Sequence, residues 1–321
     1  MHLPIELVLN VITCSLPKPN VLLRPEHPIT QLLLQFTLVC HETRRVANRA
    51  LREHCVYLSS GARLRSLLLA ISVRPDLKHI TALFLAPFST TIDQPTTVCI
   101  RELLFYTCRT LKRLIIDMPL RSLNVEDVHH LVILQTLQQG LSRLEHLEEF
   151  VSVRDEIIFD PWSGEVPLTH WPKLKRLANY NPTANRGFWR SMAGRMKHLE
   201  TLVLTRADGL RDCDIKAQYF SCCNRPIKVL LINVDSQQMR YGNFRRGGWA
   251  ADKNKIMTIM TYSIPLFMDD DAEEVCQDYV KIGAEHGTLR DWEGELIPHP
   301  PLISEPPSPS TTTNSFFETV S

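Results

Sequence analysis

Hydrophobic residues at helical spacing open the chain. Four of them recur at intervals of four, three and four residues, which places them on one face of a helix: Ile5, Leu9, Ile12 and Leu16. Pro4 stands where the first turn of a helix tolerates proline, and Glu6 lies near the positive end of the helix dipole. Pro17 and Pro19 end the pattern. It therefore predicts a short amphipathic helix over residues 3–16.

Two more short helices come after a proline-rich loop, KPNVLLRPEHP. The apolar pattern predicts one helix through residues 32–39 and another over 43–55. Three short helices within residues 1–56 bury too little apolar surface to be strongly stable alone. We expect this module to pack on the downstream domain or on a partner.

A six-residue phrase recurs between residues 60 and 235. It is apolar at its first and fourth positions, and also at its sixth except in the two copies that end in Ser152 and Asn179. Its copies are separated by 31, 36, 27, 25 and 28 residues, and they begin at Ile80, Leu111, Leu147, Leu174, Leu199 and Ile227. The phrase resembles an irregular leucine-rich repeat, LxxLxL. It predicts short parallel strands with helices over 98–108, 126–141 and 186–196 as an outer wall. Amphipathic α/β packing without a true solenoid is the alternative.

The residues between the paired apolar positions are also apolar: Phe84, Ile115, Val151, Ala178, Val203 and Leu231. They point to the second face of the predicted sheet, and a sheet that is apolar on both faces is normally covered on both. Either this face is an apolar binding groove, or the C-terminal region folds over it. We favour partial cover by residues 250–297, which contain KIMTIMTYSIPLFM and a predicted helix over about 270–284. The exposure of Ile115 and Val203 distinguishes the two.

Charged and polar residues flank these central positions on the same face of the predicted strands. A mixed-charge rim around an apolar floor is typical of protein recognition surfaces. The candidate target-binding residues are therefore Arg113, Asp117, Glu149, Arg176 and Tyr180.

The first module resembles a known family. Leu3-Pro4-x-Glu6-Leu7, then Ile12 and Leu16, then Leu38-Val39-Cys40-His41 with Thr43-Arg44-Arg45, resemble the F-box motif LPxEL…I…L and LxxVC+xWR. Here the connecting loop is longer, and Thr43 stands in place of the family's usual Trp. In that family the module docks onto the adaptor subunit of a cullin-RING ubiquitin ligase, largely through the apolar face of its first helix. The resemblance implies adaptor contacts at Leu3, Pro4, Ile5, Leu9, Ile12 and Leu38. A helical cap for the downstream domain is the alternative.

Composition excludes several classes of partner. Lys and Arg number 36 against 35 Asp and Glu in 321 residues, so no strong field favours nucleic acid or an anionic membrane. No stretch approaches the roughly 20 apolar residues of a membrane span, and no secretory signal is apparent. The nine cysteines are an odd number without a CxxC pair, which is typical of reduced thiols. We expect a cytoplasmic or nuclear protein.

Few residues suggest chemistry. Asp208-Gly209 is interpreted as a turn, and Asp212 or Asp214 as a helix N-cap, rather than as metal ligands. The aromatic and basic stretch 241–249, YGNFRRGGW, is a weak candidate for RNA contact. No phosphate loop, nucleophile elbow or HExxH helix occurs, so we expect no catalysis, metal or cofactor.

Together these patterns predict an α/β protein. A small F-box-like helical module, 1–56, precedes an irregular leucine-rich-repeat-like solenoid over 60–297 with a C-terminal lid over about 250–297. The proline- and serine-rich tail 298–321, with Ser308-Pro309, is predicted to be disordered. The predicted function is a non-enzymatic substrate receptor that links an unknown target protein to a ubiquitin ligase. A plain interaction scaffold and an enzyme of unrecognised type are the alternatives.

Overall fold

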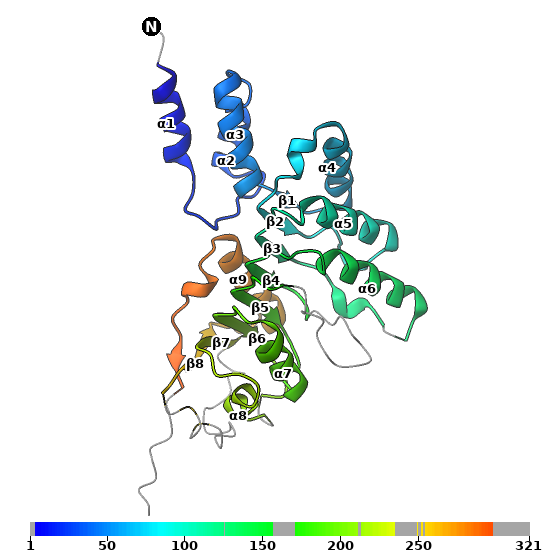
Figure 1. Ribbon diagram of the computed structural model, residues 1–321, viewed down its shortest axis with the longest axis vertical. Coiled ribbons are helices and arrows are strands. Elements are labelled where there is room, and N and C mark those ends of the chain that lie inside the picture. Colours follow the sequence, from blue (N-terminus) through cyan, green and yellow to red (C-terminus); the bar gives the residue numbers. More distant parts are fainter. Residues whose placement is uncertain are drawn as a thin grey trace, which may run out of the picture.

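The strands lie side by side in the same order as along the chain. The computed structural model describes residues 4–124, 126–156, 171–210, 213–234, 249, 252 and 254–297. Within them, one nine-stranded sheet runs in the order β1 to β9 (Figure 1). Its strands are β1 (Tyr57–Leu58), β2 (Ala82–Leu85), β3 (Arg113–Ile116), β4 (Glu149–Ser152), β5 (Arg176–Tyr180), β6 (Thr201–Thr205), β7 (Ile227–Val234), β8 (Met257–Ile264) and β9 (Glu295–Leu296). Only β9 pairs antiparallel.

Helices cover both faces of this sheet. Parallel neighbours need a connection that crosses over the sheet, and several of these connections contain helices. They are α4 (Gly61–Val73), α5 (Gln94–Thr107), α6 (Val128–Leu141), α7 (Arg186–Arg195) and α8 (Ile215–Phe220). The C-terminal helix α9 (Ala272–Glu285) lies on the opposite side from α5 and α6 (Figure 1). The predicted α/β class is confirmed, and all six repeat phrases contain a strand.

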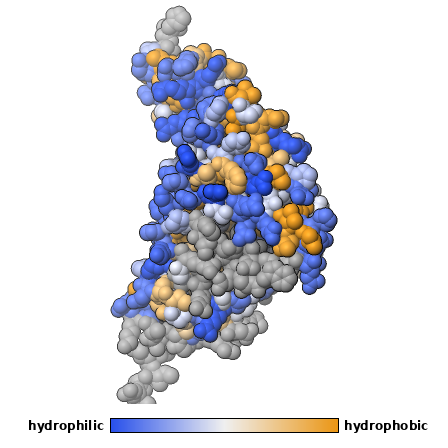
Figure 2. Space-filling model, turned by 45° about the vertical axis from the view of Figure 1, so that its right-hand side comes forward, coloured by the Kyte–Doolittle hydropathy of each residue, from blue (hydrophilic) through white to orange (hydrophobic). Residues whose placement is uncertain are grey.

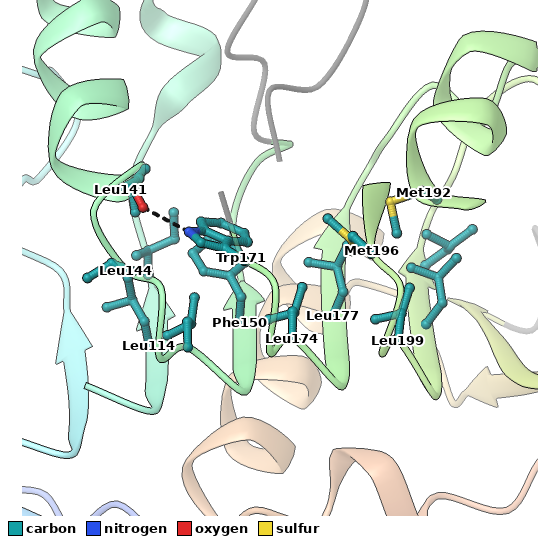
Figure 3. Packing of buried hydrophobic residues seen from close by; sticks show 14 of the residues in the cluster. Leu114, Leu141, Leu144, Phe150, Trp171, Leu174, Leu177, Met192, Met196 and Leu199 are labelled. Carbon is teal, nitrogen blue, oxygen red and sulfur yellow. Dashed lines mark hydrogen bonds between the residues drawn. The ribbon is translucent and has the colours of Figure 1, made fainter. Parts of the chain in front are cut away.

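The paired leucines of the phrases form the larger core. Leu114 and Leu177 are buried with side chains from the crossover helices, such as Leu141 and Met192 (Figure 3). In this cluster the rings of Phe150 and Trp171 stack with centroids 4.8 Å apart. The indole nitrogen of Trp171 donates a hydrogen bond to the Leu141 carbonyl at 2.8 Å, so its one polar atom is satisfied inside the core.

The second face of the sheet is covered, not open. Ile115 is 0% exposed and Val203 is 3% exposed. They share a cluster with Cys276, Val280 and Ala284 of α9. The sequence predicted that this face is covered rather than open, and that a helix over about 270–284 takes part. Both statements are correct, because α9 is that helix.

Two details of that prediction are wrong. The segment KIMTIMTYSIPLFM does not lie over the sheet, because its first half is β8, which pairs with β7 along eight positions. Val203 of β6 pairs with Leu230 of β7, so Leu230 shares its face, and Leu231, which was predicted there, belongs to the opposite core. Four consecutive apolar residues, 229–232, leave either register consistent with the sequence, and only pairing decides between them.

Three helices form the N-terminal module, as predicted. They are α1 (Ile5–Ser15), α2 (Pro28–Phe36) and α3 (His41–His54). Their shared core is small and consists of Ile12, Leu33, Ala47 and Ala50, with Leu9 and Leu16 packed at its margin. All three helices contribute to this core, and they lie together at one end of the molecule (Figure 1).

Cover by α9 makes the second face of the sheet a true core, and we expect Ile115→Ala to show this. Removing a fully buried Ile side chain should lower the free energy of unfolding by about 2–5 kcal/mol, through lost burial and a residual cavity. The control Leu69→Ala, at an exposed position of α4, should change it by less than about 0.5 kcal/mol. Urea unfolding of both variants measures the difference. Equal midpoints would contradict the packing of α9 on this face.

Candidate protein-binding sites

The N-terminal module exposes apolar side chains on its outer surface. Leu7 and Val11 of α1 are 51% and 50% exposed, and Leu38, just after α2, is 75% exposed. Val39 beside it is also exposed. Helix α1 is therefore apolar on two sides, although its own module covers only one. A helix that is apolar all round is normally buried, so this surface is a candidate protein interface.

The predicted adaptor-contact residues are divided between the two sides of the module. Pro4, Ile5 and Leu38 are exposed, and Leu9 is half-buried against the module's own cluster. Ile12 is 0% exposed, so its predicted contact with an adaptor is wrong. The residues at helical spacing face inward at Leu9, Ile12 and Leu16, because α2 and α3 pack against only this side of α1. Leu3 lies outside the described residues.

Cys40 and Thr43 begin helix α3. The Cys40 amide donates to Thr43 Oγ1 at 3.1 Å, and the two side chains lie 3.4 Å apart. Thr43 stands where the F-box motif usually has Trp. It is fully buried, and it forms part of the N-terminal cap of α3. The hydrogen bond with Thr43 lowers the pKa of the exposed Cys40 thiol.

A buried arginine dominates the predicted target-binding face. The Arg113 side chain is 4% exposed, and its Nε lies 3.2 Å from Glu149 Oε1. Its two Nη atoms donate to the backbone carbonyls of Asn20 and Ala284. Burial lowers the pKa of Arg113, whereas the charge of Glu149 raises it. Arg176 of the next strand also donates to Glu149, at 2.9 Å. The Glu149 carboxylate is therefore shared between Arg113 and Arg176.

The remaining predicted target residues also bind α9. Lys281 Nζ lies 2.8 Å from Asp117 Oδ2, and Arg154 Nε lies 3.0 Å from the other oxygen. The Tyr180 hydroxyl donates to the Glu273 carbonyl at 3.2 Å. Arg113, Asp117, Glu149 and Tyr180 are thus buried, and the prediction that they bind a target is wrong. Arg176 keeps only a small exposed part.

Helix α9 also holds the loop between α1 and α2. Arg24 Nε donates to Glu285 Oε2 at 3.0 Å, and the Tyr57 hydroxyl donates to Oε1 at 2.9 Å. The Leu22 amide donates to the Glu285 carbonyl at 2.7 Å. Gly287 comes two residues later with φ +67°, and a Cβ there would meet the Asn20 carbonyl oxygen. The module is therefore fixed to the sheet through the C-terminal helix.

The sequence contained one signal for this arrangement. Lys281 and Glu285 are four residues apart, which puts both charges on one face of the helix predicted there. That face meets Asp117 and Arg24, which are opposite in charge to the residues they contact. When a helix predicted to cover a sheet carries charges opposite to those of the residues it would cover, an internal contact is indicated rather than a surface that binds a target.

A groove of about 490 Å³ lies where the module meets the sheet. Its floor is mainly apolar and comes from α2, α3, β1 and α4, including Leu34, Leu51 and Leu67. Arg52 and Arg63 are the charged residues that line it. The groove was not predicted, because its shape depends on how these consecutive elements pack against one another, which the residue pattern does not show.

The other sequence signals have simple structural roles or lie elsewhere. Asp214 caps α8 by accepting from the Ala217 amide at 3.0 Å, and Gly209 adopts φ +76° in a turn. Across the described residues, no group of three or more His, Cys, Asp or Glu could hold a metal ion. No helix in that part of the chain is long and apolar enough to cross a membrane. Asp212, the stretch 241–249 apart from Trp249, and the tail 298–321 lie outside the described residues.

Neither the known protein-family models nor the curated proteins contain a match to this chain.

The cysteines give a test of the module's surface. We expect iodoacetamide to alkylate Cys40 fastest near neutral pH, because its pKa is lowered and its thiol is exposed. Cys276 should react slowest, since burial raises the pKa of its thiol to about 11. Mass spectrometry of timed, quenched samples measures the rates. Alkylation of Cys276 as fast as that of exposed Cys14 would contradict the position of α9.

The buried ionic cluster gives a second test. Arg113→Ala leaves the Asn20 and Ala284 carbonyls without this donor and Glu149 with one cation fewer. We expect the free energy of unfolding to fall by about 3–5 kcal/mol. The control Arg63→Ala removes an exposed arginine and should cost less than about 0.5 kcal/mol. Denaturant unfolding of both variants provides the comparison, and a loss below about 1 kcal/mol for Arg113→Ala would contradict its role.

Proposed function

We propose that this chain is an F-box-like substrate receptor. Its N-terminal module would bind the adaptor subunit of a cullin-RING ubiquitin ligase, and its leucine-rich-repeat-like domain would bind a target protein. The chain itself would carry out no chemistry. Its contribution would be to hold target and ligase together, which raises the effective concentration of one near the other.

The exposed apolar face of the module carries this proposal. Leu7 and Val11 lie one helical turn apart on α1, on the side away from the module core. Leu7 belongs to the segment that resembles the first half of the F-box motif, and exposed Leu38 and Val39 belong to the second half. Figure 2 shows hydrophobic surface among hydrophilic surface at the upper end of the molecule, where the module lies. Each half of the resemblance thus includes apolar residues that the module leaves uncovered, whereas Ile12 of the first half lies in the module core.

The fixed position of the module supports the same role. Arg24, Tyr57 and Leu22 bind Glu285, and Arg113 binds both the α1–α2 loop and α9. These contacts span the chain from its first loop to its last helix. A receptor that brings a target to a distant catalytic subunit needs such a rigid connection, because a loose one lowers the effective concentration.

The sheet supports the leucine-rich-repeat-like interpretation. Successive parallel strands lie in chain order, and the helices of the crossovers lie together opposite α9. In repeat proteins each unit contacts mainly its neighbours in the same way. The register Leu83–Leu114–Phe150–Leu177–Leu202 continues one apolar position from strand to strand.

The double variant Leu7→Asp with Val11→Asp tests the proposal. Both side chains are half exposed, so the module should stay folded while two charges enter the proposed interface. We expect the wild-type chain to bind a purified cullin-RING adaptor subunit and the variant to bind about tenfold more weakly or worse, measured by calorimetry. Leu9 and Ile12 are unsuitable for this purpose, because a buried charge at Ile12 would unfold the module.

The control is Leu69→Asp with Val73→Asp, two exposed apolar positions on one side of α4. It adds the same charges away from the module and should bind the adaptor like the wild type. Failure of the wild-type chain to bind would overturn the ligase role and favour the plain interaction scaffold. If both double variants bind the adaptor equally well, Leu7 and Val11 of α1 are not part of the adaptor interface.

A further inference from the structure

The turn between β8 and α9 displays two large apolar side chains. Phe267 is 72% exposed and Met268 is fully exposed. The turn comes after the last residue of β8, Ile264, and precedes α9 (Figure 1). Adjacent residues of this size at such exposure leave a compact apolar surface in water, which is unfavourable for the isolated chain.

Hydrogen bonds hold this turn in shape. The Phe267 amide lies 3.3 Å from Asp270 Oδ2, and the Asp270 amide donates to the Phe267 carbonyl at 3.1 Å. Asp271 then caps α9 by accepting from the amides of Glu273 and Glu274 at 2.7 and 3.1 Å. On the other side, Leu266 packs into the core beneath α9. The two exposed side chains therefore stand on a support that is already ordered, which lowers the entropy cost of binding.

Negative charge surrounds the pair. Five of the six residues from 269 to 274 are acidic, in a chain whose formal net charge is +1. Among the residues that the structure describes, no cation forms an ion pair with any of these five carboxylates. Hydrogen bonds from backbone amides lower the pKa of Asp271, so this carboxylate stays ionised near neutral pH. The apolar pair thus lies beside a cluster of carboxylates, and the charge of Arg206 also lowers the pKa of Asp271.

This combination specifies the chemistry of a partner. An apolar pocket on the partner would cover Phe267 and Met268, and lysine or arginine side chains around it would neutralise the carboxylates. Nucleic acid and anionic membranes are disfavoured, because both would be repelled. We propose that the turn 266–271 is a docking site for a basic protein segment with an apolar centre. The proposal deepens the suggested receptor role by naming its target-binding end, but the docking site does not depend on ligase binding.

A peptide selection with the full-length chain tests the proposal. A displayed library of random 16-residue peptides is panned against the wild-type protein and counter-selected against Phe267→Ser with Met268→Ser. We expect enriched peptides to carry several Lys or Arg residues around apolar ones. Synthetic copies should bind the wild type, and the serine variant should bind about tenfold more weakly or worse. Binding should also weaken as salt is raised, because the charges are exposed.

Two further variants separate charge from shape. Asp269→Lys with Glu274→Lys reverses charge but leaves Asp270 and Asp271, which hold the turn, and should weaken the same peptides. Leu69→Ser with Val73→Ser removes an equally exposed apolar pair on α4 and should change nothing. Enriched peptides that are acidic or neutral, or that bind all variants alike, would overturn the proposal, as would a selection without enrichment.

A second copy of this chain is the competing occupant. Residues 41–78 contain eight Lys and Arg against three Asp and Glu, so another copy could offer positive charge. Analytical ultracentrifugation decides this. Wild-type dimers that the Phe267→Ser, Met268→Ser variant abolishes would identify the turn as a self-association site and overturn docking of a foreign segment. The two proposals can fail separately. A wild-type chain that binds the adaptor but no basic peptide contradicts the docking site alone, and one that binds the peptides but no adaptor contradicts the ligase role alone.

Discussion

One buried guanidinium constrains the whole structure. Arg113 lies at the start of a strand whose second face is otherwise apolar, and an uncompensated charge in such a place costs several kcal/mol. Three elements compensate it: Glu149 of the next strand, the Ala284 carbonyl near the end of α9, and the Asn20 carbonyl of the first loop. The charge can be buried only when these distant segments meet. It therefore links the chain's first loop, its sheet and its last helix.

The same contact decides where partners can bind. Because α9 covers the second face of the sheet, the residues expected to form a recognition rim are used internally. Arg113 and Arg176 pair with Glu149 inside the sheet, and Asp117 pairs with Lys281 of the covering helix. In the two proposals, recognition would therefore take place at the margins of the molecule. The outer side of α1 and the Phe267–Met268 turn are such margins, and both present apolar side chains on an ordered support.

Helix α1 contributes apolar residues both to the core of the module and to its exposed surface. Its core contacts, through Ile12 with Leu9 and Leu16 at the margin, are few, which fits a module that cannot bury much surface. The other apolar residues of α1, which are Ile5, Leu7, Val8 and Val11, lie outside that core, and Leu7 and Val11 are half exposed. The module gains stability instead from its attachment to α9 through Arg24 and Leu22. This attachment leaves the outer apolar side of α1 free for another protein.

The sequence by itself determined the local elements of this protein. The LxxLxL phrases marked six strands, and apolar periodicity located the module helices and most of the outer helices, because these signals depend on residues close together in the chain. The helix over residues 270–284 was also predicted, and the apolar second face of the sheet favoured cover over an open groove.

Tertiary structure decided the remainder. Which side of α1 faces inward depends on α2 and α3, so Ile12 was assigned to the wrong partner. The register of β7 depends on β6, because residues 229–232 are apolar on both faces. The roles of Arg113 and Asp117 depend on a helix more than 150 residues away along the chain, whose Ala284 and Lys281 they contact at sequence separations of 171 and 164. The sequence does not show whether a charged residue pairs with another protein or with a residue of its own chain. Only the folded structure brings the paired residues into contact.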